Sequence, residues 1–229
     1  MNTKHKKPTL TKKQRHKLRV QQVRRQKIFL TCLFLLIVGC ILLRFSKFSG
    51  RQKETHQLNA ACEAYRDEVS SEAAQYDMSD YVDLILAVMM QESSGQGTDP
   101  MQSSEGAYNT RYPQQPNGIT DPSYSISCGI QELKYALEKA VCTGPTDLSK
   151  IRLALQAYNF GADSYFAYLE ENGQTVWTTQ SAQAFAQMAS GNTQRDEDNP
   201  LHDPAGPWDY GDQYYPDHVL RYYHLDNNS

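Results

Sequence analysis

The chain has 229 residues and a formal net charge of −3, but its charge is unevenly distributed. Residues 1–53 hold 15 of the 23 Lys and Arg and no acidic residue, whereas residues 54–229 hold 8 basic and 26 acidic residues. Such a split indicates two environments rather than one uniform domain. The composition excludes collagen-like, coiled-coil and fully disordered proteins, and the second part is long enough for one domain with a core.

An apolar segment, Ile28–Leu43, separates the two parts. It has 16 residues without a charge and spans about 24 Å as a helix, a little less than a hydrocarbon core. The residues before it carry 11 positive charges, which by the positive-inside rule keep that end in the cytoplasm and export the acidic part. We therefore predict a basic cytoplasmic tail (1–27), a single transmembrane signal anchor (28–43), a linker (44–57) and an extracellular domain (58–229).

The five cysteines are divided between the two parts. Ile37-Val38-Gly39-Cys40 resembles a bacterial lipobox, so lipidation of Cys40 is an alternative to the uncleaved anchor, although the apolar run after it favours the anchor. In the exported part, Cys62, Cys128 and Cys142 permit one disulfide, for which Cys128–Cys142 is the predicted pair. No C-x-x-C or H-x-x-x-H pattern occurs, so we predict no metal site and no cofactor.

The exported part reads as a mainly α-helical domain with one long insertion. After a first amphipathic helix over residues 58–75, the next helix (80–93) is apolar on every side from residue 84 to residue 90, with Ser79 as its N-cap. Residues 96–126 are rich in Gly, Pro, Ser and Asn and predict an irregular insertion with a small hairpin at Asn117-Gly118. Further helices are predicted over residues 127–141, 148–159, 162–171, 179–189 and 217–224, with a loop over residues 191–213.

The buried helix ends in a carboxyl group, Glu92. Residues three to four positions apart on a helix share a face, so Glu92 lies on the same stripe as Val88 and Ile85. Burial and the negative end of the helix dipole both raise the pKa of such a carboxyl group. A carboxylic acid that stays protonated near neutral pH suits a general acid; the alternative is a Glu at a fraying helix end that points to water.

A second carboxyl group, Asp99, follows seven residues later. Gly95, Gly97 and Pro100 prevent the helix from continuing, so the insertion can fold back and place Asp99 beside Glu92. Two carboxyl groups around a scissile bond are the usual apparatus of glycoside hydrolysis, where the second serves as base, nucleophile or cation stabiliser. The alternative for Asp99 is a turn-forming Asp-Pro.

Several motifs, in this order, resemble those of the lysozyme-like superfamily of goose-type lysozymes and lytic transglycosylases. Glu92-Ser93 is similar to its first signature, Ser127-Cys128-Gly129-Ile130-Gln131 to a Gly-x-x-Gln-like segment, and Ala157-Tyr158-Asn159-Phe160-Gly161 to its A-Y-N-x-G motif. The tyrosine-rich segment around Tyr210–Tyr223 is similar to its last helix. More closely, the segment from Gln91 to Glu105 resembles the muramidase domain of CwlT-type cell-wall hydrolases of Gram-positive conjugative elements.

This resemblance implies roles for individual residues. It implies that Glu92 is the catalytic acid and that Asp99 supports activity. Ser93, Gln131, Tyr158 and Asn159 would then bind substrate, since amide and phenol groups suit the hydroxyl and N-acetyl groups of sugars. Their alternative is a role in capping or packing, which for Asn159 is as plausible as binding. CwlT-type proteins usually continue into a cysteine-peptidase domain, so peptide cleavage is not expected from this chain.

The sequence and this resemblance together predict a membrane-anchored peptidoglycan N-acetylmuramidase that cleaves the MurNAc–GlcNAc β-1,4 bond. A role in local wall opening during conjugative transfer is implied by the resemblance alone. Its partners would be peptidoglycan glycan strands, the membrane and a conjugation or secretion machinery. Two alternatives stay open: a lytic transglycosylase that forms 1,6-anhydro-MurNAc ends, and a non-catalytic wall-binding component of such an apparatus. The acidic exported part argues against binding of nucleic acid.

Overall fold

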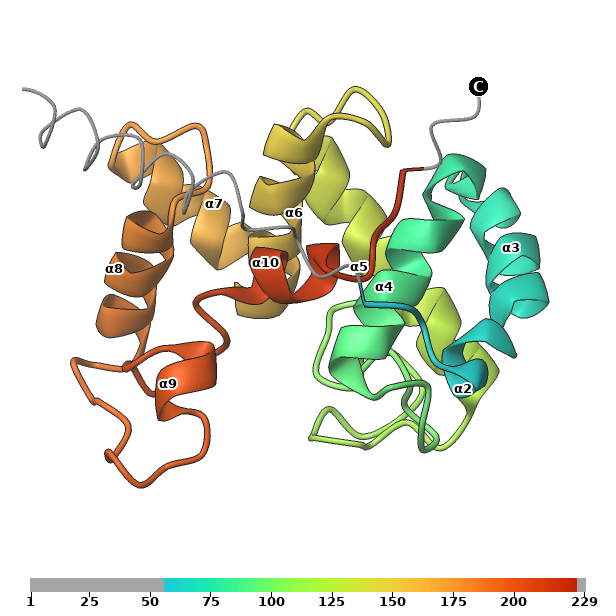
Figure 1. Cartoon of the computed structure of the whole chain (residues 1–229), viewed down its shortest axis with the longest axis horizontal. Helices are drawn as coiled ribbons and strands as arrows, with labels where there is room; N and C mark the ends of the chain where they lie inside the picture. The colour runs from blue at the N-terminus through green and yellow to red at the C-terminus, as the bar shows by residue number, and fades with distance from the viewer. Residues whose placement is uncertain (1–55, 226–229) are drawn as a thin grey trace, which may run out of the picture. The chain divides into compact units, whose positions relative to one another are not determined.

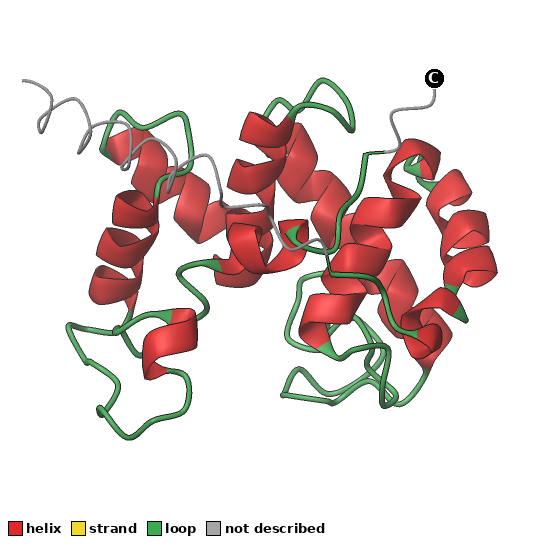
Figure 2. Cartoon of the chain, in the orientation of Figure 1, coloured by secondary structure: helices red, strands yellow, loops and turns green. Residues whose placement is uncertain are grey.

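The computed structural model describes residues 56–225 (Figure 1). All regular structure within this range is helical, joined by loops (Figure 2). The elements are α2 (Ala60–Glu63), α3 (Arg66–Gln75), the 3₁₀ turn η1 (Ser79–Tyr81), α4 (Val82–Glu92), α5 (Pro122–Lys139), α6 (Leu148–Phe160), α7 (Ala162–Glu171), α8 (Thr179–Ala189), α9 (His202–Ala205) and α10 (Tyr215–Leu220).

None of the helices in residues 56–225 is long and apolar enough to cross a lipid bilayer. The predicted tail (1–27), the predicted anchor (28–43), the alternative lipidation site Cys40 and most of the linker lie outside the described residues.

Helix α4 is the central element of the described residues, as its sequence predicts. Its side chains from Leu84 to Met89 are fully inaccessible to solvent. Helices α2, α3 and α10 all pack against it (Figure 1). Because each buried Leu or Ile contributes about 1.5–3 kcal/mol, the position of α4 is strongly fixed. The residue that ends it, Glu92, is therefore held on a rigid support.

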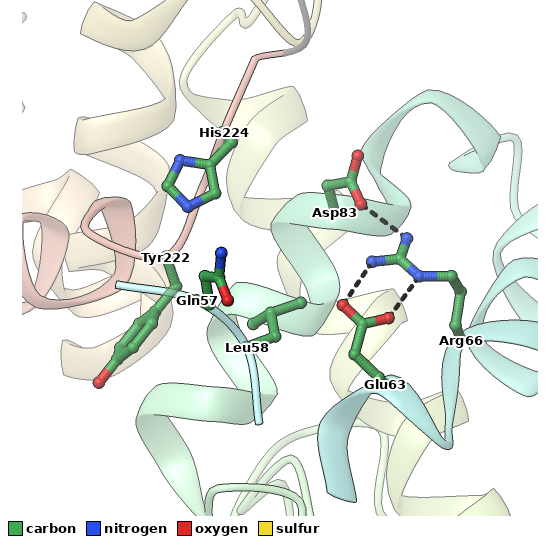
Figure 3. Close-up of a pocket in the computed structure, with 7 residues that line it drawn as sticks. All are labelled: Gln57, Leu58, Glu63, Arg66, Asp83, Tyr222 and His224. Carbon is green, nitrogen blue, oxygen red and sulfur yellow. Dashed lines mark hydrogen bonds and ion pairs between the residues drawn. The ribbon is translucent and has the colours of Figure 1, made fainter. Parts of the chain in front are cut away.

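The predicted helix over residues 58–75 is in fact two helices, α2 and α3. The Tyr65 N–H bonds to the carbonyl of Cys62 at 3.0 Å, a tight turn that interrupts the α-helical ladder. Arg66 begins α3 between two carboxylates: its guanidinium bonds Glu63 and Asp83, each at 2.7 Å (Figure 3). These contacts and the burial of Cys62 outweigh the local helical propensity of the segment.

Two helix starts differ from prediction because of capping. Helix α5 begins at Pro122 rather than at residue 127, since Asp121 accepts from the N–H groups of Ser123 and Tyr124 and proline suits the first helical position. Ser79 does not cap α4; it is the first residue of η1. Helices α6, α7 and α8 lie where the periodicity predicts. Helix α10 begins two residues before the predicted range 217–224 and ends four residues before its end, and α9 lies within the predicted loop 191–213.

The irregular insertion is confirmed over residues 96–121, but its predicted hairpin is wrong. Asn117 has a positive φ of 55°, and the Gly118 N–H bonds to the carbonyl of Gln115 at 2.9 Å, which makes a tight turn. No strand pairing follows this turn among the described residues, where the one isolated bridge joins Gln194 to Trp208. Side-chain hydrogen bonds hold the insertion instead.

The predicted Cys128–Cys142 disulfide is also wrong. Cys62, Cys128 and Cys142 are all free thiols. Cys128 lies inside α5 and Cys142 lies beyond its end, so about 17 Å of helix separates Cys128 from Lys139 alone. A disulfide requires its two Cα atoms to be within about 7 Å.

Candidate functional site

Glu92 and Tyr215 meet at the centre of the candidate site. Glu92 is the last residue of α4 and is partly buried, and the hydroxyl of Tyr215 donates a hydrogen bond to its Oε1 atom. Tyr215 begins α10 and is only 2% exposed. Because α10 packs against α4, the C-terminal helix places a fixed donor on the carboxyl group.

The surroundings of Glu92 favour its protonated form. Burial raises the pKa of Glu92 to about 7, the hydrogen bond from Tyr215 opposes this rise, and the negative charges of Asp212 and Asp99 add to it. Desolvation dominates because the charged form loses its hydration at the end of an apolar helix. A carboxylic acid with this pKa is able to give up a proton near neutral pH.

Tyr158 joins the Glu92 side of the site to the insertion. Its ring stacks on the ring of Tyr215, with centroids 6.4 Å apart and planes 20° apart. Its hydroxyl donates to the carbonyl of Met101 at 2.9 Å. Burial, followed by the charge of Glu92, raises the pKa of Tyr158 well above its ordinary value, so the phenol stays neutral.

Asp99 lies in the same region but is deeply enclosed, with 1% exposure. Its Oδ1 atom accepts from the Ser103 N–H at 3.1 Å and from the Ser125 hydroxyl at 2.6 Å. Its Oδ2 atom accepts from the Ser104 N–H at 3.2 Å and from the Ser104 hydroxyl. The Oδ1 atom thus joins the insertion to α5, and the Oδ2 atom closes a turn within the insertion.

Ser93 and Asn159 also bond to backbone near the site. The Ser93 hydroxyl donates to the carbonyl of Pro100 at 2.8 Å and accepts from the Gly95 N–H at 3.1 Å. The Asn159 side-chain oxygen accepts from the Asp212 N–H at 2.8 Å. Both residues fasten loops at the edges of the site, which is the capping role that their motifs allow.

Gln131 is not brought together with Glu92. Its Nε2 atom donates to the Ser127 carbonyl at 3.1 Å, within α5. It lines a pocket of 620 Å³ between the insertion, α3 and the start of α5. The residue that matches the Gly-x-x-Gln-like motif therefore lines a pocket that does not include Glu92.

Sequence reasoning missed the carboxylate of Asp212. Its Oδ1 atom accepts from the Tyr214 N–H at 2.9 Å, and its Oδ2 atom lies 2.5 Å from Nδ1 of His218. This pair fixes the turn that leads into Tyr215. The sequence marks segment 210–223 as tyrosine-rich. No local spacing shows which of its tyrosines bonds a carboxyl group 123 positions earlier.

Sequence reasoning also missed Glu132. Burial raises the pKa of Glu132 to about 7, although the N–H groups of Tyr108 and Ala107 favour its charged form. Its Oε1 atom lies so close to Gly106 that a Cβ there would be 1.6 Å away. Glu132 and Tyr158 line a pocket of 230 Å³ between the insertion and the start of α7.

A third pocket, of 390 Å³, lies on another part of the domain (Figure 3). Its lining includes the Glu63–Arg66–Asp83 ion pairs together with Tyr222 and His224. It shares no residue with the Glu92 cluster. The three charged groups satisfy one another, so this pocket is explained by the packing of α2 against α4.

The sequence profile of the lysozyme-like family matches residues 60–223. The chain is 34% identical over 169 residues to the bifunctional muramidase/DL-endopeptidase CwlT of Bacillus subtilis, covering 74% of this chain and 44% of that protein. It is 40% identical over 115 residues to the uncharacterized membrane protein YocA of the same organism, covering 48% and 45% of the two chains. The chain spans about half the length of these relatives.

A solved structure shows the same architecture. A crystal structure from Staphylococcus aureus, described as similar to a lipoprotein of the NLP/P60 family, superposes with a TM-score of 0.62 at 27% identity. The match covers 76% of this chain and 56% of that one. The profile match over residues 60–223 and the identity to CwlT show that the chain belongs to the lysozyme-like family.

Proposed function

We propose that the chain is a peptidoglycan N-acetylmuramidase that cleaves the MurNAc–GlcNAc β-1,4 bond with Glu92 as general acid. The observation that carries the proposal is the environment of Glu92: a carboxyl group on a rigid buried helix, with a pKa of about 7 and a fixed donor from Tyr215. Such a group protonates the leaving oxygen as the glycosidic bond breaks. CwlT, which this chain resembles, is described as a muramidase and an endopeptidase.

Asp99 is the proposed second acidic group. The transition state of glycoside hydrolysis has oxocarbenium character, and a nearby negative charge stabilises it. The influence of Asp99 on the Glu92 pKa supports a charge close enough for this role. Because its oxygens hold the insertion, we assign Asp99 an electrostatic role rather than that of a nucleophile.

For substrate binding we propose Tyr158 and Gln131 as direct contacts, since both line pockets. Ser93 and Asn159 support substrate binding indirectly, because their hydrogen bonds fix the loops at Pro100 and Asp212.

One observation favours a second reaction on the same substrate. Both oxygens of Asp99 are occupied by hydrogen bonds, whereas within residues 56–225 the Oε2 atom of Glu92 accepts none. A lytic transglycosylase uses one carboxyl group as acid and then as base, with attack by the MurNAc 6-hydroxyl. This arrangement provides one such group, and the product distinguishes the two reactions.

The test is product analysis with the full-length chain and its Glu92→Gln variant on purified peptidoglycan. We expect soluble fragments with reducing MurNAc ends, released at least about 100-fold more slowly by the variant. Fragments lighter by one water identify anhydro ends and favour the transglycosylase. If the parent and the variant release the same fragments at the same rate from each of several wall types, the catalytic proposal fails and a non-catalytic wall-binding role replaces it.

We also propose that segment 28–43 anchors the enzyme in the membrane with its N-terminus in the cytoplasm and its lysozyme-like domain outside. The basic residues before the segment and the membrane-protein description of the relative YocA support this. Protease added to intact cells should digest residues 58–229 and leave the tail protected. A role in wall opening during conjugative transfer extends the proposal, and transfer frequency in a Glu92→Gln strain tests it.

A further inference from the structure

A hollowed surface extends from the neighbours of Glu92 to a larger pocket. The pocket of 230 Å³ includes Tyr158, the residue that stacks on Tyr215. It shares Ala107 and Tyr108 with the pocket of 620 Å³. The two pockets therefore adjoin along the insertion, and Tyr158, through its stacking on Tyr215, connects the smaller pocket to the residue that bonds Glu92.

The larger pocket has the walls that a saccharide requires. Tyr76 and Tyr108 provide aromatic side chains, and Ser127 and Gln131 provide polar groups. Tyr76 and Ser127 are fixed by a hydrogen bond of 3.0 Å between their hydroxyls. Among the described residues, no partner bonds the Tyr108 hydroxyl or the Gln131 side-chain oxygen. These atoms are available for the hydroxyl groups of a ligand.

Arg111 adds a positive charge at this pocket. Its guanidinium lies 4.5 Å from the centroid of the Tyr124 ring, which holds the planar group in place. Within residues 56–225, it is the one Lys or Arg side chain that has neither a hydrogen-bond acceptor nor a carboxylate within 4.0 Å. A stacked guanidinium with free N–H groups is suited to bidentate binding of a carboxylate.

Two acidic residues also line the pocket, and both have other partners. Glu72 accepts a hydrogen bond of 2.8 Å from Gln75. Asp121 caps α5 and accepts from the N–H groups of Ser123 and Tyr124. Neither carboxylate lies within 4.0 Å of the Arg111 guanidinium, so the arginine keeps its capacity for an anion from outside the chain.

We infer that the larger pocket is a glycan-binding site remote from the scissile bond, and that Arg111 binds a carboxylate carried by the glycan. This inference rests on the proposed function, because it extends a glycan held near Glu92 from the smaller pocket at Tyr158 into the adjoining larger pocket. In peptidoglycan the carboxylate belongs either to the lactyl ether of MurNAc or to the attached peptide. The chemistry that Arg111 recognises is the same for both.

Binding to the full-length Glu92→Gln chain, measured by calorimetry, tests the inference without turnover. The probes are peptide-free GlcNAc–MurNAc chains with free lactyl carboxylates, the same chains with peptides attached, and neutral GlcNAc oligomers of equal length. Adding Arg111→Gln should weaken binding of a carboxylated probe about tenfold and leave the neutral oligomer unchanged. The matched control is Lys150→Gln, which removes one positive charge from α6 and should leave all three affinities unchanged.

The possible results distinguish failure of the Arg111 inference from failure of the proposed function. Loss with the peptide-free chains identifies the lactyl carboxylate as the group bound, and loss only with peptide-bearing chains identifies the peptide; each supports the inference. Equal affinities with and without Arg111, or an equal loss for the neutral oligomer, overturn it. If the Glu92→Gln chain binds no glycan probe at all, the proposed function itself fails. A circular dichroism spectrum identical to that of the parent chain shows that the Arg111 variant is folded.

Discussion

The hydroxyl of Tyr215 donates a hydrogen bond to Glu92, although the two residues lie 123 positions apart in the chain. The bond stabilises the carboxylate, whereas burial of Glu92 stabilises the neutral acid. The pKa of about 7 results from these two opposing effects together with the negative charges of Asp212 and Asp99, which add to the rise. The central helix α4 and the last helix α10 therefore meet in one titratable pair, and the pair sets the pH range of any acid catalysis.

Replacement of Tyr215 by Phe removes the hydrogen bond and keeps most of the packing. Because the bond favours the charged form, the pKa of Glu92 should rise, and the alkaline limb of the pH–rate profile should move up by about one pH unit. The rate on the acidic plateau should fall about tenfold, since the carboxyl group loses its orientation. Rates of fragment release between pH 4 and pH 9 measure both effects.

Tyr165→Phe is the matched control for this change. Tyr165 is also fully buried, and its hydroxyl bonds to Ser181 at 3.5 Å in a contact that does not involve Glu92. Loss of the Tyr165 hydroxyl should lower the free energy of unfolding without moving the pH–rate profile. An unmoved profile in the Tyr215 variant would show that the hydrogen bond does not control Glu92.

Asp212 should act on Glu92 in the opposite sense. Its negative charge raises the pKa of Glu92, so Asp212→Asn should lower that pKa and move the alkaline limb down by roughly half a unit. The charged or titratable groups that act on Glu92 are Tyr215, Asp212 and Asp99, and His218 in turn bonds Asp212 at 2.5 Å. The shift is read from kcat/KM on a soluble glycan fragment as a function of pH.

Asp217→Asn makes the same change of charge on α10 at an exposed position, where Asp217 pairs with Arg152 at 2.6 Å. It should leave the profile in place. A profile that moves equally in both variants would point to the net charge of the domain rather than to Asp212.

Asp99→Asn should destabilise the insertion. The asparagine NH2 group that replaces one carboxylate oxygen would face hydrogen-bond donors. In one orientation these are the N–H and hydroxyl of Ser104, and in the other they are the Ser103 N–H and the Ser125 hydroxyl. Buried donors without acceptors cost about 1–3 kcal/mol each, so we expect a loss of about 2–4 kcal/mol in urea denaturation. Asp77→Asn, at a side chain that is 97% exposed, is the control and should be neutral.

Ser125→Ala separates the charge of Asp99 from its anchoring role. It removes one hydrogen bond of 2.6 Å and leaves the carboxylate. If the charge supports the reaction, this variant should keep most of its activity at a temperature where it is folded, and folded Asp99→Asn should not. Equal losses in the two variants would contradict the electrostatic role.

The sequence predicts the central helix and its terminal carboxyl group because both depend on local pattern. Residues 84–89 are apolar in every direction, and a helix of this kind has one stable location, the core. Helices α6, α7 and α8 also carry complete local signals, including the Thr178–Ser181 capping box. The class of fold and the position of Glu92 follow from these signals.

The partners of Glu92 depend on tertiary contacts that no local signal records. Tyr215 is one of 15 tyrosines, and only the packing of α10 on α4 selects it. Likewise, Gln131 matches a motif by residue type but lines a pocket that does not include Glu92. The break between α2 and α3 has the same origin, since the ion pairs of Arg66 involve Asp83, 17 positions away.

Glu92→Gln should change stability in a pH-dependent way. The folded-state pKa of about 7 exceeds the ordinary value of 4.5, so between these values the folded chain binds more protons than the unfolded chain and the free energy of unfolding falls as pH rises. A neutral glutamine avoids this loss. At pH 8 the free energy of unfolding of the variant should therefore exceed that of the parent by about 2 kcal/mol, which corresponds to roughly 4–8 °C in Tm. At pH 4 the two proteins should be equally stable. Thermal denaturation at the two pH values measures the difference, with Glu171→Gln at the exposed end of α7 as the control. An equal difference at both pH values would show that Glu92 is not the residue whose ionisation opposes folding.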